Sequence, residues 1–292
     1  MSKHYFYLGD AKQVLKELPT ESVNCVVTSP PYWGLRDYGV EGQLGKEPTP
    51  KEYVSQLVEI FREVRRVLKN DGTLWLNLGD TYNGTKIGNT ETKKNPKAVT
   101  DSFVKKAIPE LKIKDLIGIP WMVAFALRDD GWYLRSDIIW EKPNVMPESV
   151  KDRPTKSHEY IFLFSKAGNY YYDYEGIKVP SAVDPTKLRN KRTVWPINTK
   201  PFPDAHFAVF PPELVEPCIL AGCPPGGTVL DPFGGTGTTT LVAMKHGRDS
   251  IYIDLSEEYL NIALNRLGFS KDSGKLFDVN QWEIIDLRDC KN

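Results

Sequence analysis

Cysteine and histidine are both scarce in this sequence. Only 4 cysteines and 4 histidines occur among 292 residues, and no two cysteines form a CxxC pair. Such pairs are typical of zinc sites and redox centres, so we expect the protein to hold no metal. Isolated cysteines of this kind indicate reduced thiols in a cytoplasmic protein.

Long apolar runs and a net charge are absent as well. No uncharged apolar run approaches the length of a membrane span, and the first ten residues, MSKHYFYLGD, lack the apolar stretch of a signal peptide. Lys and Arg together number 38, as do Asp and Glu, so the formal net charge is zero. A zero net charge does not exclude a nucleic-acid partner, because clustering of charge on one face decides that. The 40% of hydrophobic residues suffice for a sizeable core.

Strand-like and helix-like segments alternate along the chain, which indicates an α/β fold with a mostly parallel sheet. Asp10 is expected to cap the first helix, and Thr49 and Glu52 have capping-box spacing around Pro50. Strands are expected at 5–8, 23–28, 73–78, 133–140, 159–165, 228–230 and 251–253, with the last 25 residues at a sheet edge. Helices are expected at 11–18, from 50 to a turn at 70–72, and at 113–127, 211–221, 236–246 and 257–267.

The segment TVLDPFGGTGTT, residues 228–239, predicts a strand, a glycine-rich turn and a helix. In open α/β sheets such a turn lies where ligands bind. No lysine follows the glycines, which disfavours a P-loop. Thr240 replaces the third glycine of a dinucleotide fingerprint, and Asp231 would repel a pyrophosphate. Asp254 ends the next strand, and two carboxylates suit a ligand with a cation and an unphosphorylated ribose, as S-adenosylmethionine has.

The stretch TSPPYW, residues 28–33, supplies groups suited to methyl transfer. An exocyclic amine of a base is a poor nucleophile because its lone pair is delocalised, and it improves when its N–H groups donate to fixed acceptors. The Ser29 hydroxyl and the Pro30 carbonyl are such acceptors, and the double proline holds them still. The Tyr32 ring can stack on a base rotated out of the duplex.

Two other chemistries are disfavoured. Methylation of cytosine at C5 needs a cysteine nucleophile after a proline, but Pro217-Cys218 lies inside an expected apolar helix, where a core thiol belongs. His158 and Glu159 open an expected strand, and we interpret them as a structural pair. A dedicated general base is not required, because the amine can lose its proton to water after the transfer.

Together, the two stretches make the sequence resemble the β class of amino-methylating DNA methyltransferases, and the similarity covers most of the chain. The resemblance implies a Rossmann-like methyltransferase fold with helices on both faces of a mostly parallel sheet and a circularly permuted motif order. Residues 1–165 would form the catalytic half, 166–205 a small irregular target-recognition region, and 206–292 the cofactor-binding half of the same domain.

The resemblance also assigns roles to residues. Ser29, Pro30, Pro31 and Tyr32 match the catalytic motif. The segment HFAVFP at 206–211 resembles one that packs over the methionine end of the cofactor, although Phe207 and Val209 replace prolines. Residues implied to bind S-adenosylmethionine, and its product S-adenosylhomocysteine, are Asp10, Ala11, Ser29, Pro30, His206, Phe210, Pro211, Asp231, Pro232, Phe233, Gly235, Thr236, Gly237, Thr238 and Asp254.

Serine before PPY goes mostly with N4 of cytosine in this family, and aspartate or asparagine with N6 of adenine. The resemblance therefore implies a site-specific cytosine-N4 methyltransferase acting by direct in-line transfer to a flipped base. Methylation of adenine N6, of RNA or of a protein amide stays open at this point, as does a catalytically inactive DNA-binding module of the same fold. A nicotinamide oxidoreductase is a more distant alternative.

Basic clusters indicate the DNA-facing surface. Residues 184–200 hold five cations and one anion, and residues 81–115 hold eight cations and four anions. The loop 81–112 is expected to lie at the DNA, and the DNA-contacting residues are expected to be Trp33, Arg36, Arg153, Lys187, Arg189, Lys191 and Arg192. The resemblance further implies a protein of a bacterium, archaeon or phage, either monomer or homodimer, with double-stranded DNA and a cognate restriction endonuclease as partners.

Overall fold

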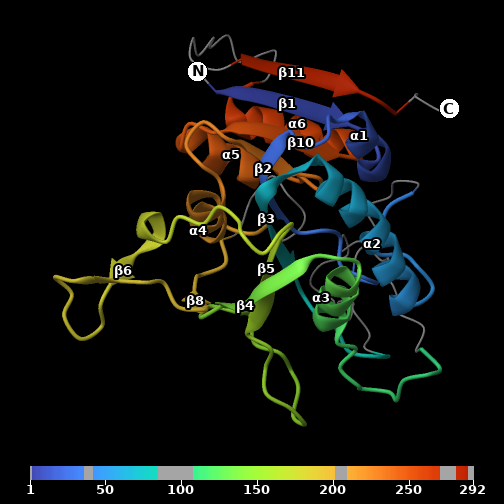
Figure 1. Cartoon of the computed structure of the whole chain (residues 1–292). Coiled ribbons are helices and arrows are strands. Elements are labelled where there is room, and N and C mark those ends of the chain that lie inside the picture. The colour runs from blue at the N-terminus through green and yellow to red at the C-terminus, as the bar shows by residue number, and fades with distance from the viewer. Residues whose placement is uncertain (1, 36–41, 85–107, 201–208, 270–280, 289–292) are drawn as a thin grey trace.

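A nine-stranded sheet runs through the computed structural model, which describes residues 2–35, 42–84, 108–200, 209–269 and 281–288 (Figure 1). The strand order is β11-β1-β10-β9-β2-β3-β5-β4-β8. Strand β5 runs antiparallel to β3 and β4, and the other neighbouring pairs are parallel, as predicted for a mostly parallel sheet. The strands are β1 (Lys3–Leu8), β2 (Val23–Thr28), β3 (Leu68–Leu78), β4 (Tyr133–Glu141), β5 (His158–Ser165), β8 (Val194–Pro196), β9 (Thr228–Asp231), β10 (Asp249–Asp254) and β11 (Gln281–Asp286).

Helices cover both faces of this sheet (Figure 1). One face carries α1 (Ala11–Glu17), α2 (Pro50–Val67) and α3 (Ile119–Asp129), and the other carries α4 (Pro212–Gly222), α5 (Thr238–Lys245) and α6 (Glu257–Leu267). Because β2 is buried on both faces, successive residues enter different cores: Val26 packs with the first set of helices and Val27 with the second. This explains why its sequence is apolar without alternation.

Residues 166–200 form a less regular region, as expected. A 3-10 turn at Glu175–Ile177 is followed by β6 (Val179–Pro180) and β7 (Leu188–Arg189), which pair with each other and not with the main sheet. Strand β8 then joins the main sheet beside β4. Among the residues that the structure describes, no helix is both long and apolar enough to cross a membrane.

Two sequence-based boundaries are wrong. Residues 70–72 do not form a turn after α2, because β3 begins at Leu68 and already pairs with β2 there. The helix expected from residue 113 begins only at Ile119. Before it, Leu116 forms a bridge with Tyr82, and the Asp80 carboxylate accepts hydrogen bonds from the backbone N–H groups of Gly118 and Ile119. These contacts hold residues 113–118 in a non-helical conformation.

The capping box at the start of α2 is confirmed and allows a stability prediction. The Glu52 backbone N–H donates to Thr49 Oγ1 at 3.2 Å, and the Thr49 N–H donates to Glu52 Oε2 at 3.0 Å. A Thr49→Ala variant should lose about 1 kcal/mol of unfolding free energy, measured by urea denaturation. Ser55→Ala, at an exposed position within the same helix, should be neutral or slightly stabilising. Equal effects of the two substitutions would contradict the importance of this cap.

The strand order brings the sequence motifs together. Strands β1, β10, β9 and β2 are parallel neighbours, so their carboxyl ends meet at one edge of the sheet. Asp10 follows β1, Asp254 ends β10, and the glycine turn and TSPPYW follow β9 and β2. Because β5 runs the other way, its first residues, His158 and Glu159, reach that same edge.

Candidate active site

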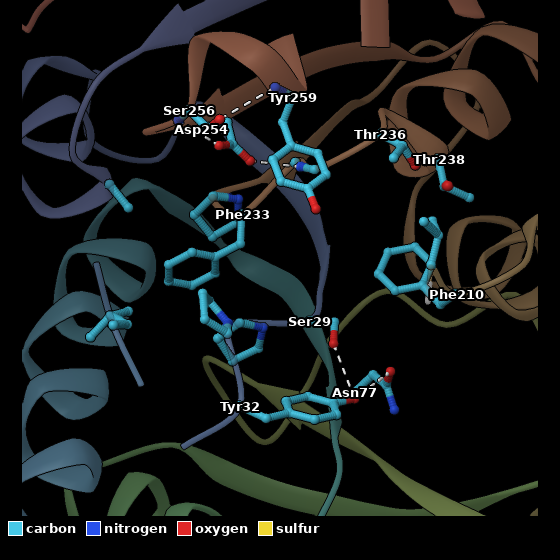
Figure 2. Close-up of a pocket in the computed structure, with 18 of the residues that line it drawn as sticks. Ser29, Tyr32, Asn77, Phe210, Phe233, Thr236, Thr238, Asp254, Ser256 and Tyr259 are labelled. Atoms are coloured by element: carbon cyan, nitrogen blue, oxygen red, sulfur yellow. Dashed lines mark hydrogen bonds between the residues drawn. The ribbon is translucent and has the colours of Figure 1, made fainter. Parts of the chain in front are cut away.

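A cavity of about 280 Å³ opens at this edge of the sheet. Figure 2 shows Asp254, Ser256 and Tyr259 at one end of it, and Ser29, Tyr32 and Asn77 at the other. Phe233 and Phe210 lie on opposite sides between the two ends. The predicted residues that line the cavity are Asp10, Ala11, Ser29, Pro30, Pro31, Tyr32, Phe210, Pro232, Phe233, Gly235, Thr236, Thr238 and Asp254.

Asp254 organises the first end. Its Oδ2 accepts from the Gly235 backbone N–H and its Oδ1 from that of Ser256, both at 2.8 Å. Burial raises the pKa of the Asp254 carboxyl to about 6. Gly234 packs so closely on the Tyr252 ring that a Cβ there would lie 2.2 Å from it, which explains why a glycine stands at this position. The carboxylate is thus held rigidly, with acceptor capacity left for hydroxyl groups.

The glycine turn is unsuited to binding phosphate. The backbone N–H groups of Gly234 and Gly237 donate to the carbonyls of Ile253 and Gly234, and the Gly235 N–H donates to Asp254. A phosphate-binding loop needs such N–H groups free to point at the anion. These three N–H groups are therefore not available to a phosphate, whereas the Asp254 carboxylate fits the hydroxyl groups of an unphosphorylated ribose, as the sequence suggested.

Asp231 requires a correction. It does not line the cavity and is 1% exposed. Its carboxylate accepts from Thr28 Oγ1 at 2.6 Å and from Thr239 Oγ1 at 2.7 Å, and burial raises its pKa to about 6. Asp231 therefore ties the end of β2 to β9 and α5, and it positions the catalytic stretch beside the glycine turn instead of contacting a ligand. Pro211 and Gly237 also lie outside the lining, and His206 lies outside the described residues.

The catalytic stretch forms the second end of the cavity. The Tyr53 hydroxyl donates to the Pro31 carbonyl at 2.8 Å and fixes the double proline from the side of α2. The Ser29 hydroxyl donates to Tyr32 Oη at 3.2 Å (Figure 2). Tyr32 Oη in turn lies 2.7 Å from Glu159 Oε2 and 3.2 Å from Asn77 Oδ1. Burial raises the pKa of the Tyr32 hydroxyl well above its usual range, so it stays a hydrogen-bond donor.

Sequence reasoning missed Asn77 and Lys142 at this end of the cavity, and it gave Glu159 a structural role only. The Lys142 ammonium pairs with Glu159 Oε1, and Asn77 Nδ2 donates to Glu159 Oε2 at 3.1 Å. Burial alone would raise the pKa of Glu159, but Lys142 and the hydrogen bonds from Tyr32 and Asn77 leave it below its usual value. The expected His158–Glu159 pair is wrong, because His158 packs edge-on against Tyr160 while Glu159 turns into the cavity.

Trp33 is a second correction. Its side chain is 5% exposed within the core on the α2 side, and its Nε1–H donates to the Glu47 carbonyl at 2.9 Å. It therefore has no surface for DNA. Arg153 stacks over the Tyr82 ring at 4.0 Å and pairs with Glu148.

Several cations of the predicted basic region at 184–200 make contacts within the protein. Lys187 pairs with Asp184, and Lys191 lies 4.9 Å from the centre of the Trp195 ring. Arg189 donates to the Asn190 carbonyl, and Arg192 lies on an exposed part of the region. Arg36 and most of the loop 81–112 lie outside the described residues.

Comparison with known proteins defines the class of the chain. A family model described as a DNA methylase, covering the N6 and N4 amino methyltransferases, matches residues 23–265. The chain belongs to this family, which confirms the resemblance inferred from the two motifs. It is accordingly an S-adenosylmethionine-dependent DNA methyltransferase of the amino-methylating kind.

Individual relatives are closely similar in sequence. The chain is 55% identical over 261 residues to the type II methyltransferase M.Cfr9I of Citrobacter freundii, covering 89% of this chain and 86% of the relative. It is 55% identical over 262 residues to the type II methyltransferase M.SmaI of Serratia marcescens, covering 89% of both chains.

Solved structures share the fold. A candidate DNA modification methylase from Thermus thermophilus, solved with S-adenosyl-L-methionine, is 26% identical, with a TM-score of 0.63 over 97% of this chain and 100% of that one. The PvuII DNA methyltransferase, described as cytosine-N4-specific, is 24% identical, with a TM-score of 0.68 over 91% of this chain and 86% of that one. That second likeness concerns the fold alone.

The residues present fit the cofactor of the family. The Asp254 carboxylate can accept from ribose hydroxyls, the Phe233 ring offers a flat apolar face nearby, and the second end leaves a polar site for an amine. Within the described ranges, no group of three or more His, Cys, Asp or Glu side chains could hold a metal ion. Cys218 is buried and donates to the Leu214 carbonyl, and burial raises its pKa far above the usual range, as for a core thiol.

Proposed function

We propose that the protein methylates N4 of cytosine in double-stranded DNA. The observation that carries the proposal is Ser29, a neutral hydroxyl at the catalytic end of the cavity, hydrogen-bonded to Tyr32. In this family, serine at this position goes mostly with cytosine. The family itself includes both N4 and N6 methylation, so Ser29 is the feature that favours one of the two.

The chain's own groups account for the reaction as follows. The Ser29 hydroxyl and the Pro30 carbonyl accept hydrogen bonds from the amine and hold its lone pair toward the cofactor end. The Tyr53–Pro31 hydrogen bond keeps these acceptors fixed, and fixed geometry is worth several kcal/mol of the barrier. The Tyr32 ring lines the cavity as a stacking surface for a base that has left the duplex. S-adenosylmethionine supplies the methyl group when it is bound.

We assign the cofactor to the end built around Asp254. Its carboxylate would accept from the ribose hydroxyls, Phe233 would pack on the adenine, and Asp10 would contact the adenine region. Phe210, Thr236 and Thr238 line the opposite side, where the methionine end would lie. Arg266 supports this side, because its guanidinium donates to Thr236 Oγ1 at 3.0 Å and to Thr238 Oγ1 at 2.8 Å.

The target-recognition region is proposed to be 166–205, between a catalytic half at 1–165 and a cofactor-binding half at 206–292. Its exposed cations Lys187 and Arg192 are candidates for phosphate contacts. The type II relatives make a cognate restriction endonuclease the proposed partner in the cell.

Product analysis tests the proposal. The protein is incubated with S-adenosylmethionine and genomic DNA amplified in vitro, which is unmethylated, and the nucleosides are identified by mass spectrometry. We expect N4-methylcytosine from the wild type and about 100-fold less from Ser29→Ala, because the amine loses a fixed acceptor. Ser55→Ala, on the exposed side of α2, should behave as the wild type. N6-methyladenine would overturn the cytosine assignment, and no methylated base would overturn DNA as the substrate.

A further inference from the structure

A continuous hydrogen-bonded chain leads from the catalytic serine to a buried carboxylate. The Ser29 hydroxyl donates to Tyr32 Oη at 3.2 Å, and Tyr32 Oη donates to Glu159 Oε2 at 2.7 Å. All three residues line the same cavity. The direction of donation is the same at both steps, so each hydroxyl can take a proton from one side while it gives one up on the other.

We propose that Glu159 is the final proton acceptor of the methylation reaction, reached from the amine through the hydroxyls of Ser29 and Tyr32. The inference rests on the proposed transfer to an amine beside Ser29, but it holds for cytosine and adenine alike. It replaces the sequence-based interpretation, in which Glu159 is structural and the proton leaves to water. Glu159 does not touch the base and acts through Tyr32.

The proton balance of the step is complete. The amine nitrogen forms its bond to the methyl carbon as the carbon–sulfur bond breaks, so the positive charge passes from sulfur to nitrogen. The amine proton then moves to Ser29 Oγ, the serine proton to Tyr32 Oη, and the tyrosine proton to Glu159 Oε2. The carboxylate becomes neutral, and the methylated amine is left uncharged. Glu159 later releases the proton to water.

The surroundings of Glu159 suit a carboxylate that must begin the reaction ionised. Side chains of Lys142 and Glu159 are each 16% exposed, and the ammonium pairs with Oε1, leaving Oε2 to Tyr32 and Asn77. Asn77 is anchored by a second hydrogen bond from its Nδ2 to the Tyr160 carbonyl at 3.1 Å. An ion pair that served only to join β4 and β5 would not need contact with the catalytic tyrosine.

Glu159→Gln tests the inference, because glutamine keeps the size and can accept from Tyr32 but cannot take the proton. With saturating S-adenosylmethionine and in-vitro amplified genomic DNA, the single-turnover methylation rate should fall about 100-fold, the lower range for general acid–base catalysis. The dissociation constants of both ligands should change less than about twofold, which is smaller than the effect of losing one hydrogen bond. Glu141→Gln, at the neighbouring exposed position, should keep the wild-type rate.

We call the path from Ser29 through Tyr32 to Glu159 the proton relay. Tyr32→Phe removes its middle hydroxyl and keeps the aromatic ring. It should slow the chemical step by a similar factor, and the Tyr32→Phe/Glu159→Gln double variant should be no slower than the slower single variant. Residues that act as one unit are non-additive in this way. Losses that multiply in the double variant would overturn the relay.

The pH profile separates a relay from a structural role. Lys142 pairs with Glu159, Tyr32 and Asn77 donate to it, and the charges of Lys156 and His158 act on it from nearby. Since the pKa of Glu159 lies below its usual value, the wild-type single-turnover rate should be flat from about pH 6.5 to 9. The Glu159→Gln rate should rise with pH, because hydroxide then takes the proton. Parallel profiles would show that Glu159 acts only structurally.

Loss of Glu159 leaves the Lys142 ammonium buried without its partner, which can cost several kcal/mol of stability. A Glu159→Gln/Lys142→Met variant removes both charges together and keeps the test decisive if the single variant does not fold. Slow transfer with intact cofactor binding in that variant supports the relay. A wild-type rate in either variant overturns it, whichever base the product analysis identifies.

Discussion

An Asp254→Ala variant is expected to bind S-adenosylmethionine at least about 100-fold more weakly than the wild type. The proposed pair of ribose hydroxyls would donate two hydrogen bonds to this carboxylate, each worth about 1.5–3 kcal/mol because the acceptor is charged. The substitution also removes the acceptor that holds the Gly235 and Ser256 N–H groups. Isothermal titration calorimetry measures the affinity directly.

The same residue should make cofactor binding depend on pH. Burial raises the pKa of the Asp254 carboxyl to about 6 in the free protein. A carboxylate binds hydroxyls and a nearby cation better than a carboxylic acid does, so affinity should be full from about one pH unit above this pKa. As pH falls through 6 it should drop, by up to about tenfold per unit, because one proton must be released on binding. Asp254→Asn should abolish this slope.

Asp231 provides a matched control for the pH effect. Burial raises its pKa to about 6 as well, but its carboxylate is bonded to Thr28 and Thr239 behind the cavity wall. Asp231→Asn should therefore keep the pH slope of cofactor binding, provided that the variant folds. A wild-type affinity that is constant from pH 5 to 8 would contradict the assignment of Asp254 as the ionised ribose ligand.

Features that depend on neighbouring residues in the sequence were predicted correctly. Asp10 caps α1, Thr49 and Glu52 form the capping box of α2, and the glycine turn follows β9. Each of these depends on residues within a few positions of one another. The carboxyl-end position of the two motifs also followed, because parallel neighbours in an α/β sheet end at the same edge.

The features that were not predicted from the sequence depend on contacts between segments that are distant along the chain. Glu159 and Lys142 reach the cavity only because β5 runs antiparallel between β3 and β4, which pairs Trp140 with Glu159. The charge of Asp231 suggested a ligand contact, but two threonines, one of them 203 positions away, use its oxygens. Trp33 beside the catalytic tyrosine suggested a stacking surface, whereas the fold turns it into the core. Residue type alone cannot distinguish these outcomes.

Gly79→Ala is expected to slow methylation about 100-fold while cofactor binding stays near the wild-type level, because the substitution disturbs only acid–base and stacking groups. Gly79 directly follows β3, and a Cβ there would lie 2.6 Å from Tyr32 Cε2 and 3.0 Å from Cδ2. The ring cannot yield freely, since its hydroxyl is hydrogen-bonded to Ser29, Asn77 and Glu159. The single-turnover rate and calorimetric cofactor affinity check the two halves of the prediction.

Gly168→Ala is the matched control, because a Cβ there makes only an ordinary contact of 3.7 Å with Tyr133. It should keep the wild-type rate. If the relay operates, Tyr32→Phe already removes the proton path. Adding Gly79→Ala to Tyr32→Phe should then lower the methylation rate further only by displacing the stacking face of the ring. A wild-type rate for Gly79→Ala would mean that Tyr32 can leave its hydrogen bonds without cost, and both the stacking role of the ring and its place in the relay would then fail together.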